Sequence, residues 1–432
     1  MNITIFGSGY VGLTTAACLA DLGHHILCVD IDEKKIAMLK QGKVPFFEPD
    51  LEPLMKKCSA KKHLNFTINA KDAVEFGDVL FNCVGTPSRN NGEADLSAVF
   101  AVAESIAQHI NGYKIIVNKS TVPPGTARKV KEIIRIASVD FDVVSNPEFL
   151  REGAAIRAFN YPDKIVVGTE SERPLHVMRK VYAGRMRTYL PIVETNWETA
   201  ELIKYANNAF LATKISFINE IANICDKVGA DVKMVALALG LDYRISPRFL
   251  NAGVGYGGSC FPKDVKAIAQ TAKRHGYTAR LLEEVTALNE RQKHVIVEKI
   301  NAAFKNNIKE KMLCIFGLSF KPKTSDMRDA PSITIITELL SAGAKIQAYD
   351  PEAMQEARKI FGDKITYCTS PEQAAKGSHA LVLITEWDEF RNLDLRELRK
   401  IMKDNKLFDG RNIYEPELVK EDGFEYYGIG RA

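Results

Sequence analysis

The sequence lacks long apolar runs, a dominant charge and a basic, apolar leader. Its longest apolar stretches, such as Ala380–Thr385, fall far short of the roughly 18 residues that cross a bilayer. The chain opens directly on the strand-like segment Asn2–Phe6, so we expect neither membrane spanning nor export. Lys and Arg number 58 against 54 Asp and Glu, an excess too small to favour nucleic acid as a partner.

Paired cysteine motifs are missing as well. Eight cysteines occur, but none forms a CxxC pair, so a structural zinc site is not expected and we predict no metal. Most lie in apolar surroundings, as Cys28, Cys83 and Cys314 do, which is typical of buried free thiols rather than disulfides. These features predict a reduced, cytoplasmic protein. Cys260, in a glycine-rich segment, is the exception.

What the chain does contain is an alternation of short β-branched runs with helix-length segments, at both ends. The predicted strands of the first region are Ile3–Phe6, His25–Val29, Val79–Val84, Lys114–Asn118, Asp142–Ser145 and Lys164–Val167. Those of the second are Met312–Phe316, Lys345–Tyr349, Ile365–Tyr367, Ala380–Ile384 and Lys406–Phe408. Such alternation predicts βαβ units and mostly parallel sheets.

The region between them has no strand signal. Glu198–Val228 contains neither proline nor glycine and has apolar residues at helical spacing, which predicts a helix longer than usual, serving as a spacer or a dimerisation spine. We therefore expect an α/β protein of two Rossmann-like, doubly wound domains joined by a helical central domain. The expected boundaries are 1–196, 197–303 and 304–432, and the expected assembly is a homodimer.

Residues 7–12 read GSGYVG, follow a predicted strand and open a helix. This context is the one that a dinucleotide fingerprint requires. Gly7 permits the tight turn, Gly9 lets the backbone approach a pyrophosphate, and Gly12 allows close packing of helix and strand. The N–H groups of Tyr10 and Val11 would bind phosphate oxygens at the helix N-terminus.

An acidic residue, Asp30, ends the next predicted strand. Its carboxylate would accept hydrogen bonds from ribose hydroxyls and repel a 2′-phosphate, which favours NAD over NADP. Asp32 is a rival for this role, although its position is more typical of a helix start. A glycine turn that only packs is the alternative to a cofactor site. In the second α/β region only Gly317 remains of the glycine pattern, so it lacks the full fingerprint.

Cys260 lies in the segment GVGYGGSCFPKD, residues 253–264. The glycines would let a ligand approach the backbone closely. A predicted helix start at Pro262 and the nearby Lys263 both favour a thiolate, and Asp264 could orient water or accept a proton. A buried structural cysteine explains the thiol equally well. Beside a dinucleotide site, however, a thiol can trap an aldehyde that is then oxidised by hydride transfer.

Several ordered blocks over the whole chain resemble the nucleotide-sugar dehydrogenases, a family that includes the UDP-glucose, GDP-mannose and UDP-N-acetylmannosamine dehydrogenases. The blocks are Gly7–Gly12, Lys119–Thr126, Asn146–Gly153, Glu201–Phe210, Gly257–Asp264, Phe320–Lys321, Asp326–Arg328 and Asp409–Arg411. Ser259, directly before the cysteine, resembles the UDP-glucose branch, because the N-acetyl sugar branch usually carries His there.

The resemblance implies an NAD-dependent, four-electron oxidation of UDP-glucose to UDP-glucuronate, through a thiohemiacetal and a thioester on Cys260. The catalytic positions that it implies are Thr121, Glu148, Glu152, Lys204, Asn208, Cys260 and Asp264. Lys204 and Asn208 lie four residues apart on a predicted helix and would stabilise the oxyanion. Asp264, with Thr121 and a water, would help remove the alcohol proton, and Glu152 would assist hydrolysis of the thioester.

The same resemblance implies a 1–196 NAD-binding domain and a 304–432 UDP-sugar-binding domain. Beyond the fingerprint, the cofactor-side positions are Lys35, Thr86, Thr121, Glu152, Lys263 and Arg328. The substrate positions are Glu148, Phe149, Leu150, Arg151, Glu152, Lys204, Asn208, Phe249, Leu250, Asn251, Ala252, Gly253, Gly257, Lys321 and Arg411, with Arg244 donated across the dimer. For each basic residue taken alone, solvated surface is the ordinary explanation.

The sequence leaves two other functions open. One is a dehydrogenase of another nucleotide sugar, GDP-mannose or a UDP-N-acetylhexosamine. The other is a non-catalytic regulator or scaffold that binds NAD, which leaves the set of Cys260, Lys204 and Asp264 without an explanation.

Overall fold

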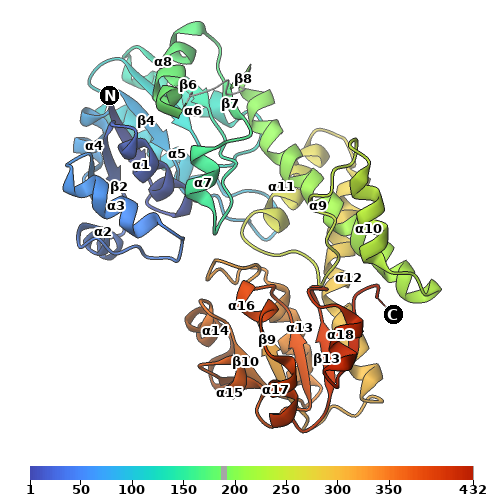
Figure 1. Ribbon diagram of the computed structural model, residues 1–432. Helices are drawn as coiled ribbons and strands as arrows, with labels where there is room; N and C mark the ends of the chain where they lie inside the picture. The colour runs from blue at the N-terminus through green and yellow to red at the C-terminus, as the bar shows by residue number, and fades with distance from the viewer. Residues whose placement is uncertain (186–191, 432) are drawn as a thin grey trace. The chain divides into compact units, whose positions relative to one another are not determined.

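The computed structural model describes residues 1–185 and 192–431. The chain divides into two compact units, Met1–Asn207 and Asn208–Ala432, which are called unit 1 and unit 2 below (Figure 1). This division does not test the predicted domain boundaries at 196 and 303, which stay a prediction.

Unit 1 is built on a sheet that, in its described residues, has eight strands in the order β3-β2-β1-β4-β5-β6-β7-β8. The strands are β1 Asn2–Phe6, β2 His25–Val29, β3 Leu64–Thr67, β4 Val79–Asn82, β5 Lys114–Asn118, β6 Phe141–Ser145, β7 Ile165–Gly168 and β8 Ile192–Thr195. All neighbours pair in parallel except β6 and β7. The helices between them are α1 Tyr10–Asp21, α2 Glu33–Lys40, α3 Leu51–Ala60, α4 Ala70–Phe76, α5 Ser97–His109, α6 Thr126–Ile134, α7 Ala155–Asn160 and α8 Glu172–Tyr182.

Unit 2 combines helices with a second parallel sheet. Its described strands are ordered β11-β10-β9-β12-β13-β14. They are β9 Met312–Phe316, β10 Lys345–Tyr349, β11 Thr366–Tyr367, β12 Ala380–Leu383, β13 Lys406–Asp409 and β14 Glu425–Gly428. The helices ahead of this sheet are α9 Trp197–Val228, α10 Val232–Leu241, α11 Phe261–Arg274 and α12 Arg280–Ala303; those within it are α13 Pro331–Ser341, α14 Met354–Phe361, α15 Pro371–Ala375, α16 Asp388–Arg391, α17 Leu395–Ile401 and α18 Pro416–Glu421.

The long helix expected over 198–228 is confirmed as α9, which begins in unit 1 and continues in unit 2. The expected fold class, two Rossmann-like α/β regions connected by helices, is also confirmed. Strands β3, β8 and β14 go beyond the expected set. They lie at sheet edges, where a strand is covered less completely and its apolar signal is weaker.

Burial on both faces explains why the inner strands read as continuous apolar runs. All residues of β4 and β5 are buried, because helices cover each side of a parallel sheet. Fully buried side chains such as Phe81 in unit 1 and Phe408 in unit 2 each contribute about 1.5–3 kcal/mol by leaving water. Two well-packed sheets therefore hold the turns at their carboxyl ends in place.

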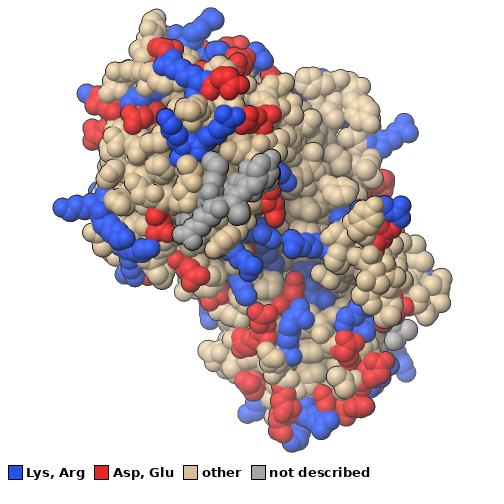
Figure 2. All heavy atoms as spheres, turned by 45° about the horizontal axis from the view of Figure 1, so that its top comes forward, with Lys and Arg blue, Asp and Glu red and all other residues tan. Residues whose placement is uncertain are grey.

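The outer surface carries charges of both signs. Acidic and basic side chains are intermingled over both units on the face that Figure 2 shows, as the small net charge leads one to expect. Of the helices in the described residues, none combines the length and the apolar character that a membrane span requires.

Candidate active site

In the fingerprint turn between β1 and α1, protein atoms crowd the positions of Gly7 and Gly12, whereas the position of Gly9 is open. Gly7 has φ +93°, and a Cβ on Gly12 would lie 1.9 Å from the Gly7 carbonyl oxygen, so both positions require glycine. A Cβ on Gly9 would meet nothing within 4 Å. The space beside Gly9, at the N-terminus of a 12-residue helix, fits the pyrophosphate of a dinucleotide.

The end of β2 supplies the acidic group beside this turn. Asp30 accepts hydrogen bonds from the Ser8 N–H at 2.8 Å, from the Asp32 N–H at 3.0 Å and from the Lys35 ammonium at 3.1 Å. Burial by itself would raise the pKa of Asp30, but a bond from the Ser8 hydroxyl at 2.7 Å, together with these three, outweighs it and the pKa is lowered from its ordinary value. Oδ1 carries only the Asp32 bond among those three and keeps a lone pair for a ribose hydroxyl.

Asp32 has the other role considered for it. Its carboxylate accepts the Lys35 N–H at 3.0 Å as the N-cap of α2, so the expectation that Asp32 starts a helix is confirmed. The ammonium of Lys35, a cofactor-side position of the sequence analysis, reaches Asp30. The two residues therefore form one ionic group at the predicted ribose position.

The corresponding turn of unit 2 does not fit a dinucleotide. Gly317 is the counterpart of Gly7, and the residue at the place of Gly9 is Ser319, which is 1% exposed. Asp350, the counterpart of Asp30, is 1% exposed and accepts hydrogen bonds from the Leu318 N–H at 2.7 Å and the Trp387 indole at 3.2 Å. Its carboxylate is committed to the interior of unit 2, so the dinucleotide site belongs to unit 1.

A buried ion pair joins two of the expected catalytic positions in unit 1. The Lys204 ammonium on α9 lies 3.0 Å from a Glu148 carboxylate oxygen, and both side chains are less than a tenth exposed. The ring of Phe149 lies 5.4 Å from the Lys204 nitrogen and 4.6 Å from that of Lys164. Both ammonium groups therefore lie within the distance at which a cation is attracted to an aromatic ring.

Thr121 and Glu152 lie in the turns that follow β5 and β6. The Thr121 carbonyl oxygen accepts the Thr86 hydroxyl at 2.9 Å, which brings together two of the cofactor-side positions. Glu152 is half-buried and Arg151 is exposed. Leu150 donates its N–H to Glu148, so the backbone after β6 wraps around that carboxylate.

Glu48 is a residue of this site that the sequence analysis missed. Its buried carboxylate accepts the hydroxyl of Tyr10 at 2.6 Å and the N–H groups of Gly153 and Ala155 at 2.6 and 2.7 Å. It therefore ties the fingerprint to the turn that carries Glu152. The signal in the sequence was weak: an acidic residue directly after two phenylalanines.

In unit 2, Cys260 is the N-cap of α11, and Pro262 stands in the first turn of that helix. The positive end of the helix dipole therefore faces the sulfur. Asp264 lies one turn further along α11, is 1% exposed, and accepts hydrogen bonds from Lys263 at 2.6 Å and from the Asn208 amide at 2.7 Å. Four predicted site residues are thus gathered around one helix start.

Burial distinguishes Cys260 from the remaining cysteines. All eight belong to the described residues and are free thiols; seven are buried, whereas Cys260 is partly exposed. Burial raises the pKa of Cys83 to about 12 and that of Cys314 well above its ordinary range, so these thiols stay protonated and inert. Cys260 is therefore the thiol among them that a ligand can reach.

Two of the glycines before Cys260 are required by packing, and the expected approach of a ligand to them stays a prediction. A Cβ on Gly257 would lie 2.4 Å from the Asp329 carbonyl oxygen, and one on Gly258 would lie 2.7 Å from the Phe320 ring. Packing inside unit 2 already requires them. Phe249, at the start of the predicted substrate segment, has φ +65°, a left-handed conformation that costs a bulky residue about 1–2 kcal/mol.

The basic residues that are predicted to bind substrate differ in how they are held. Arg411 is half-buried, and its guanidinium bonds the carbonyl oxygens of residues 255, 320 and 384 at 2.7–3.3 Å, so it braces three loops of unit 2. Arg328 pairs with Asp326 and Arg244 with Asp242, and both arginine side chains are largely exposed. The Lys321 nitrogen lies 5.4 Å from the Phe320 ring.

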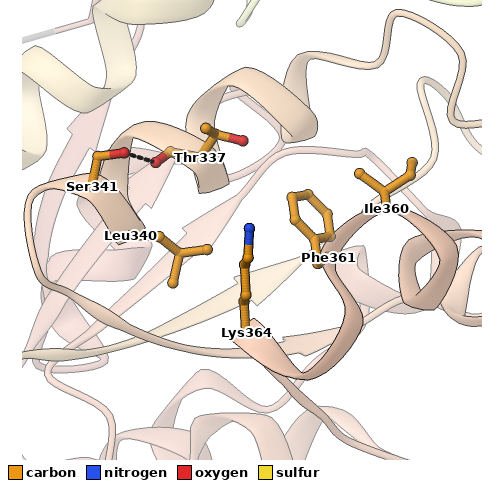
Figure 3. Close-up of a pocket in the computed structure, with 6 residues that line it drawn as sticks. All are labelled: Thr337, Leu340, Ser341, Ile360, Phe361 and Lys364. Atoms are coloured by element: carbon orange, nitrogen blue, oxygen red, sulfur yellow. Dashed lines mark hydrogen bonds between the residues drawn. The ribbon is translucent and has the colours of Figure 1, made fainter.

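A separate hollow of about 280 Å³ lies in unit 2 among α13, α14 and the turn after α14. Figure 3 shows the Lys364 side chain rising between Leu340 and Phe361, with Ser341 bonded to the Thr337 carbonyl oxygen. Its six lining residues include no carboxylate and no thiol. The hollow is therefore not a candidate for the redox chemistry.

Three family models match the chain in order. The NAD binding domain of the UDP-glucose/GDP-mannose dehydrogenase family matches residues 1–185, its central domain residues 198–291 and its UDP binding domain residues 314–416. The chain belongs to the UDP-glucose/GDP-mannose dehydrogenase family. As a member of that family it is an NAD-dependent oxidoreductase, and its own residues fit NAD at the turn around Gly9 and Asp30.

Relatives with a name match this chain over its whole length. A UDP-glucose 6-dehydrogenase of Rhizobium meliloti is 49% identical over 436 residues, which is 100% of both chains. The UDP-glucose 6-dehydrogenase TuaD of Bacillus subtilis is 44% identical and matches 100% of this chain and 93% of its own length. Among solved structures, a UDP-glucose dehydrogenase from Pyrobaculum islandicum has a TM-score of 0.93 at 33% identity and covers 100% of this chain and 98% of that one.

Proposed function

We propose that this protein oxidises UDP-glucose to UDP-glucuronate with two molecules of NAD. The observation that carries the proposal is the end-to-end similarity, at 40–49% identity, to relatives named UDP-glucose 6-dehydrogenase. Oxidising a CH2OH group to a carboxylate removes four electrons and consumes one water. Bound NAD accepts the hydride in each of the two steps.

The residues around α11 would perform the first part of the reaction. Asp264, fixed by Lys263 and Asn208, acts with Thr121 and a water to take the proton of the C6 hydroxyl while the hydride leaves C6. The Cys260 sulfur then forms a bond to the aldehyde carbon, which gives a thiohemiacetal and keeps the aldehyde bound. Support for this role comes from the exposure of Cys260 and its place at a helix N-terminus.

The second part needs an anion to be stabilised and a water to attack. Loss of the second hydride from the thiohemiacetal leaves a thioester on Cys260. Lys204 and Asn208, one turn apart on α9, would donate hydrogen bonds to the oxyanions, each worth about 3 kcal/mol when well placed. Glu152 would accept the proton of the water that hydrolyses the thioester, which releases the acid and the thiol.

Turnover with a panel of nucleotide sugars tests this function. UDP-glucose is expected to yield about two NADH per sugar consumed, because the bound aldehyde is carried on to the acid. GDP-mannose and UDP-N-acetylmannosamine are expected to yield far less. A ratio near one would contradict the thioester route, and a preference for another sugar would favour the alternative of a different nucleotide-sugar dehydrogenase.

We also propose a homodimer formed through α9 and α10, in the cytoplasm. Phe210, Phe217 and Ile224 recur every seven residues on α9 and are 65%, 47% and 51% exposed. Exposed apolar residues continue on α10 with Met234 and Leu237. A stripe of this kind is unusual on a monomer and supports contact with a second copy. The free thiols support a reducing compartment.

A further inference from the structure

Glu201 is a buried carboxylate of unit 1 that the proposed reaction does not use. It lies on α9, three residues before Lys204, and is 2% exposed. One oxygen accepts the N–H of Gly125 at 2.7 Å, and the other accepts the N–H of Ala127 at 2.8 Å and the Ser145 hydroxyl at 3.1 Å. A single side chain of α9 thus holds both the start of α6 and the end of β6.

The start of α6 depends on this carboxylate. The N-cap residue is Gly125, with φ +91°, and glycine has no side chain that could bind the first N–H groups of the helix. A carboxylate at that end satisfies those groups and faces the positive end of the helix dipole. Burial raises the pKa of Glu201 to about 7, although its three donors favour the charged form.

A buried carboxylate is a costly way to cap one helix, since a Ser or Asn at the N-cap would serve. What it adds is a rigid connection between α9 and the turn before α6. That turn follows Thr121, whose carbonyl oxygen is fixed by Thr86 at 2.9 Å. One turn further along α9, Lys204 lies 3.0 Å from Glu148.

We propose that Glu201 is a positioning residue of the reaction, which fixes Thr121 relative to Lys204 and Glu148 by anchoring α9 to the turn before α6. This role rests on the proposed function, in which Thr121 and Lys204 act on the substrate. Glu201 itself acts only through the backbone that it holds.

The substitution Glu201→Gln tests the role. The amide keeps the size of the side chain but has one acceptor oxygen, and its NH2 would face a backbone N–H, so one of the two bonds to the turn is lost. The kcat for UDP-glucose oxidation is expected to fall about 10- to 100-fold, as for a misplacement of about 1 Å. The KM values for NAD and UDP-glucose are expected to stay within about threefold, because most of the positions predicted to bind the two ligands lie outside the turn that Glu201 holds.

Glu198→Gln is the matched control. Glu198 lies on the same helix and also contacts α6, through Arg128 at 2.8 Å, but it is exposed, and its loss should leave kcat within about twofold. Glu201→Asp keeps the charge with a shorter reach and should show an intermediate loss of kcat. If circular dichroism shows that Glu201→Gln does not fold, the kcat of Glu201→Asp is measured to test the role instead.

The outcomes separate the two proposals. A kcat within twofold of the wild type for the folded Glu201 variants, an equal loss in Glu198→Gln, or a change confined to KM overturns the positioning role and leaves the proposed function intact. Wild-type protein that forms no NADH from any nucleotide sugar overturns the proposed function, and the positioning role falls with it.

Discussion

Among single residues, the cysteines show how one side-chain type takes two chemical roles. Seven are small apolar groups of the cores, and desolvation keeps the thiols of Cys28, Cys83 and Cys314 protonated by raising their pKa. Cys260 differs because it is partly exposed at the first turn of α11. Position in the fold, rather than residue type, therefore decides which thiol is accessible enough for the nucleophilic role proposed for Cys260.

This difference predicts the outcome of thiol labelling. Native protein treated with a water-soluble disulfide reagent should release about one equivalent per chain rapidly, with the other thiols reacting only after unfolding. Cys260→Ser should lose the fast equivalent and all net oxidation to the acid, while NAD binding by titration stays within about twofold, because the fingerprint is untouched. Cys58→Ala, which removes a buried thiol, is the control. A fast equivalent that survives in Cys260→Ser would refute the assignment.

At the scale of elements, the two β–α turns of units 1 and 2 share a glycine start but differ in what surrounds it. In unit 1, Gly9 faces open space and Asp30 keeps a lone pair for a ligand. In unit 2 the residue at the place of Gly9 is Ser319, which is 1% exposed, and Asp350 is enclosed. The shared glycine start is therefore followed in unit 1 by a short open turn that fits a cofactor, and in unit 2 by a longer segment that runs to the start of α13 at Pro331.

Two alanine substitutions in one turn should separate stability from binding. Gly12→Ala places a methyl group 1.9 Å from the Gly7 carbonyl oxygen, so the free energy of unfolding should fall by about 1–3 kcal/mol or more. Gly9→Ala meets open space and should leave stability nearly unchanged while it weakens NAD binding at least tenfold by crowding the pyrophosphate. Urea unfolding and NAD titration measure the two effects. Equal stability losses would show that the turn only packs.

At the scale of the whole molecule, α9 and α10 carry an exposed apolar stripe, and contact with another protein surface would explain it. Side chains such as Phe210 and Phe217 are 65% and 47% exposed, so each forgoes part of the about 1.5–3 kcal/mol that full burial supplies. A second copy that presents the same stripe would bury it on both sides. The largely exposed Arg244 follows α10 directly, which suits the implied donation of this arginine to a partner.

Phe217→Asp should therefore shift the protein toward the monomer. Light scattering at micromolar concentration is expected to give about twice the chain mass for the wild type and the mass of one chain for the variant, since a buried unpaired charge opposes association. Ile136→Asp is the control, because Ile136 is 82% exposed, belongs to unit 1 and is not part of the stripe. A wild-type monomer with full activity would refute the dimer.

The local patterns of the chain predicted most of the elements. Period and turn residues identified α9 and α11 and the inner strands, because these signals depend only on neighbours in sequence. The edge strands β3, β8 and β14 were not predicted, because partial burial leaves them without a clear apolar run. The roles of Glu48 and Glu201 were not predicted, because their partners are backbone N–H groups 105 and 76 residues away in the sequence.

The sequence by itself determined where a dinucleotide turn, a long helix and a thiol at a helix start would form, since each is written in a few consecutive residues. Only the tertiary structure decided which carboxylates bind which backbone groups, which of the two acidic strand ends stays open, and which thiol remains accessible. Those outcomes depend on burial and on hydrogen-bond partners from distant segments. The residues next to a glutamate in the sequence do not indicate which distant groups its carboxylate will bind.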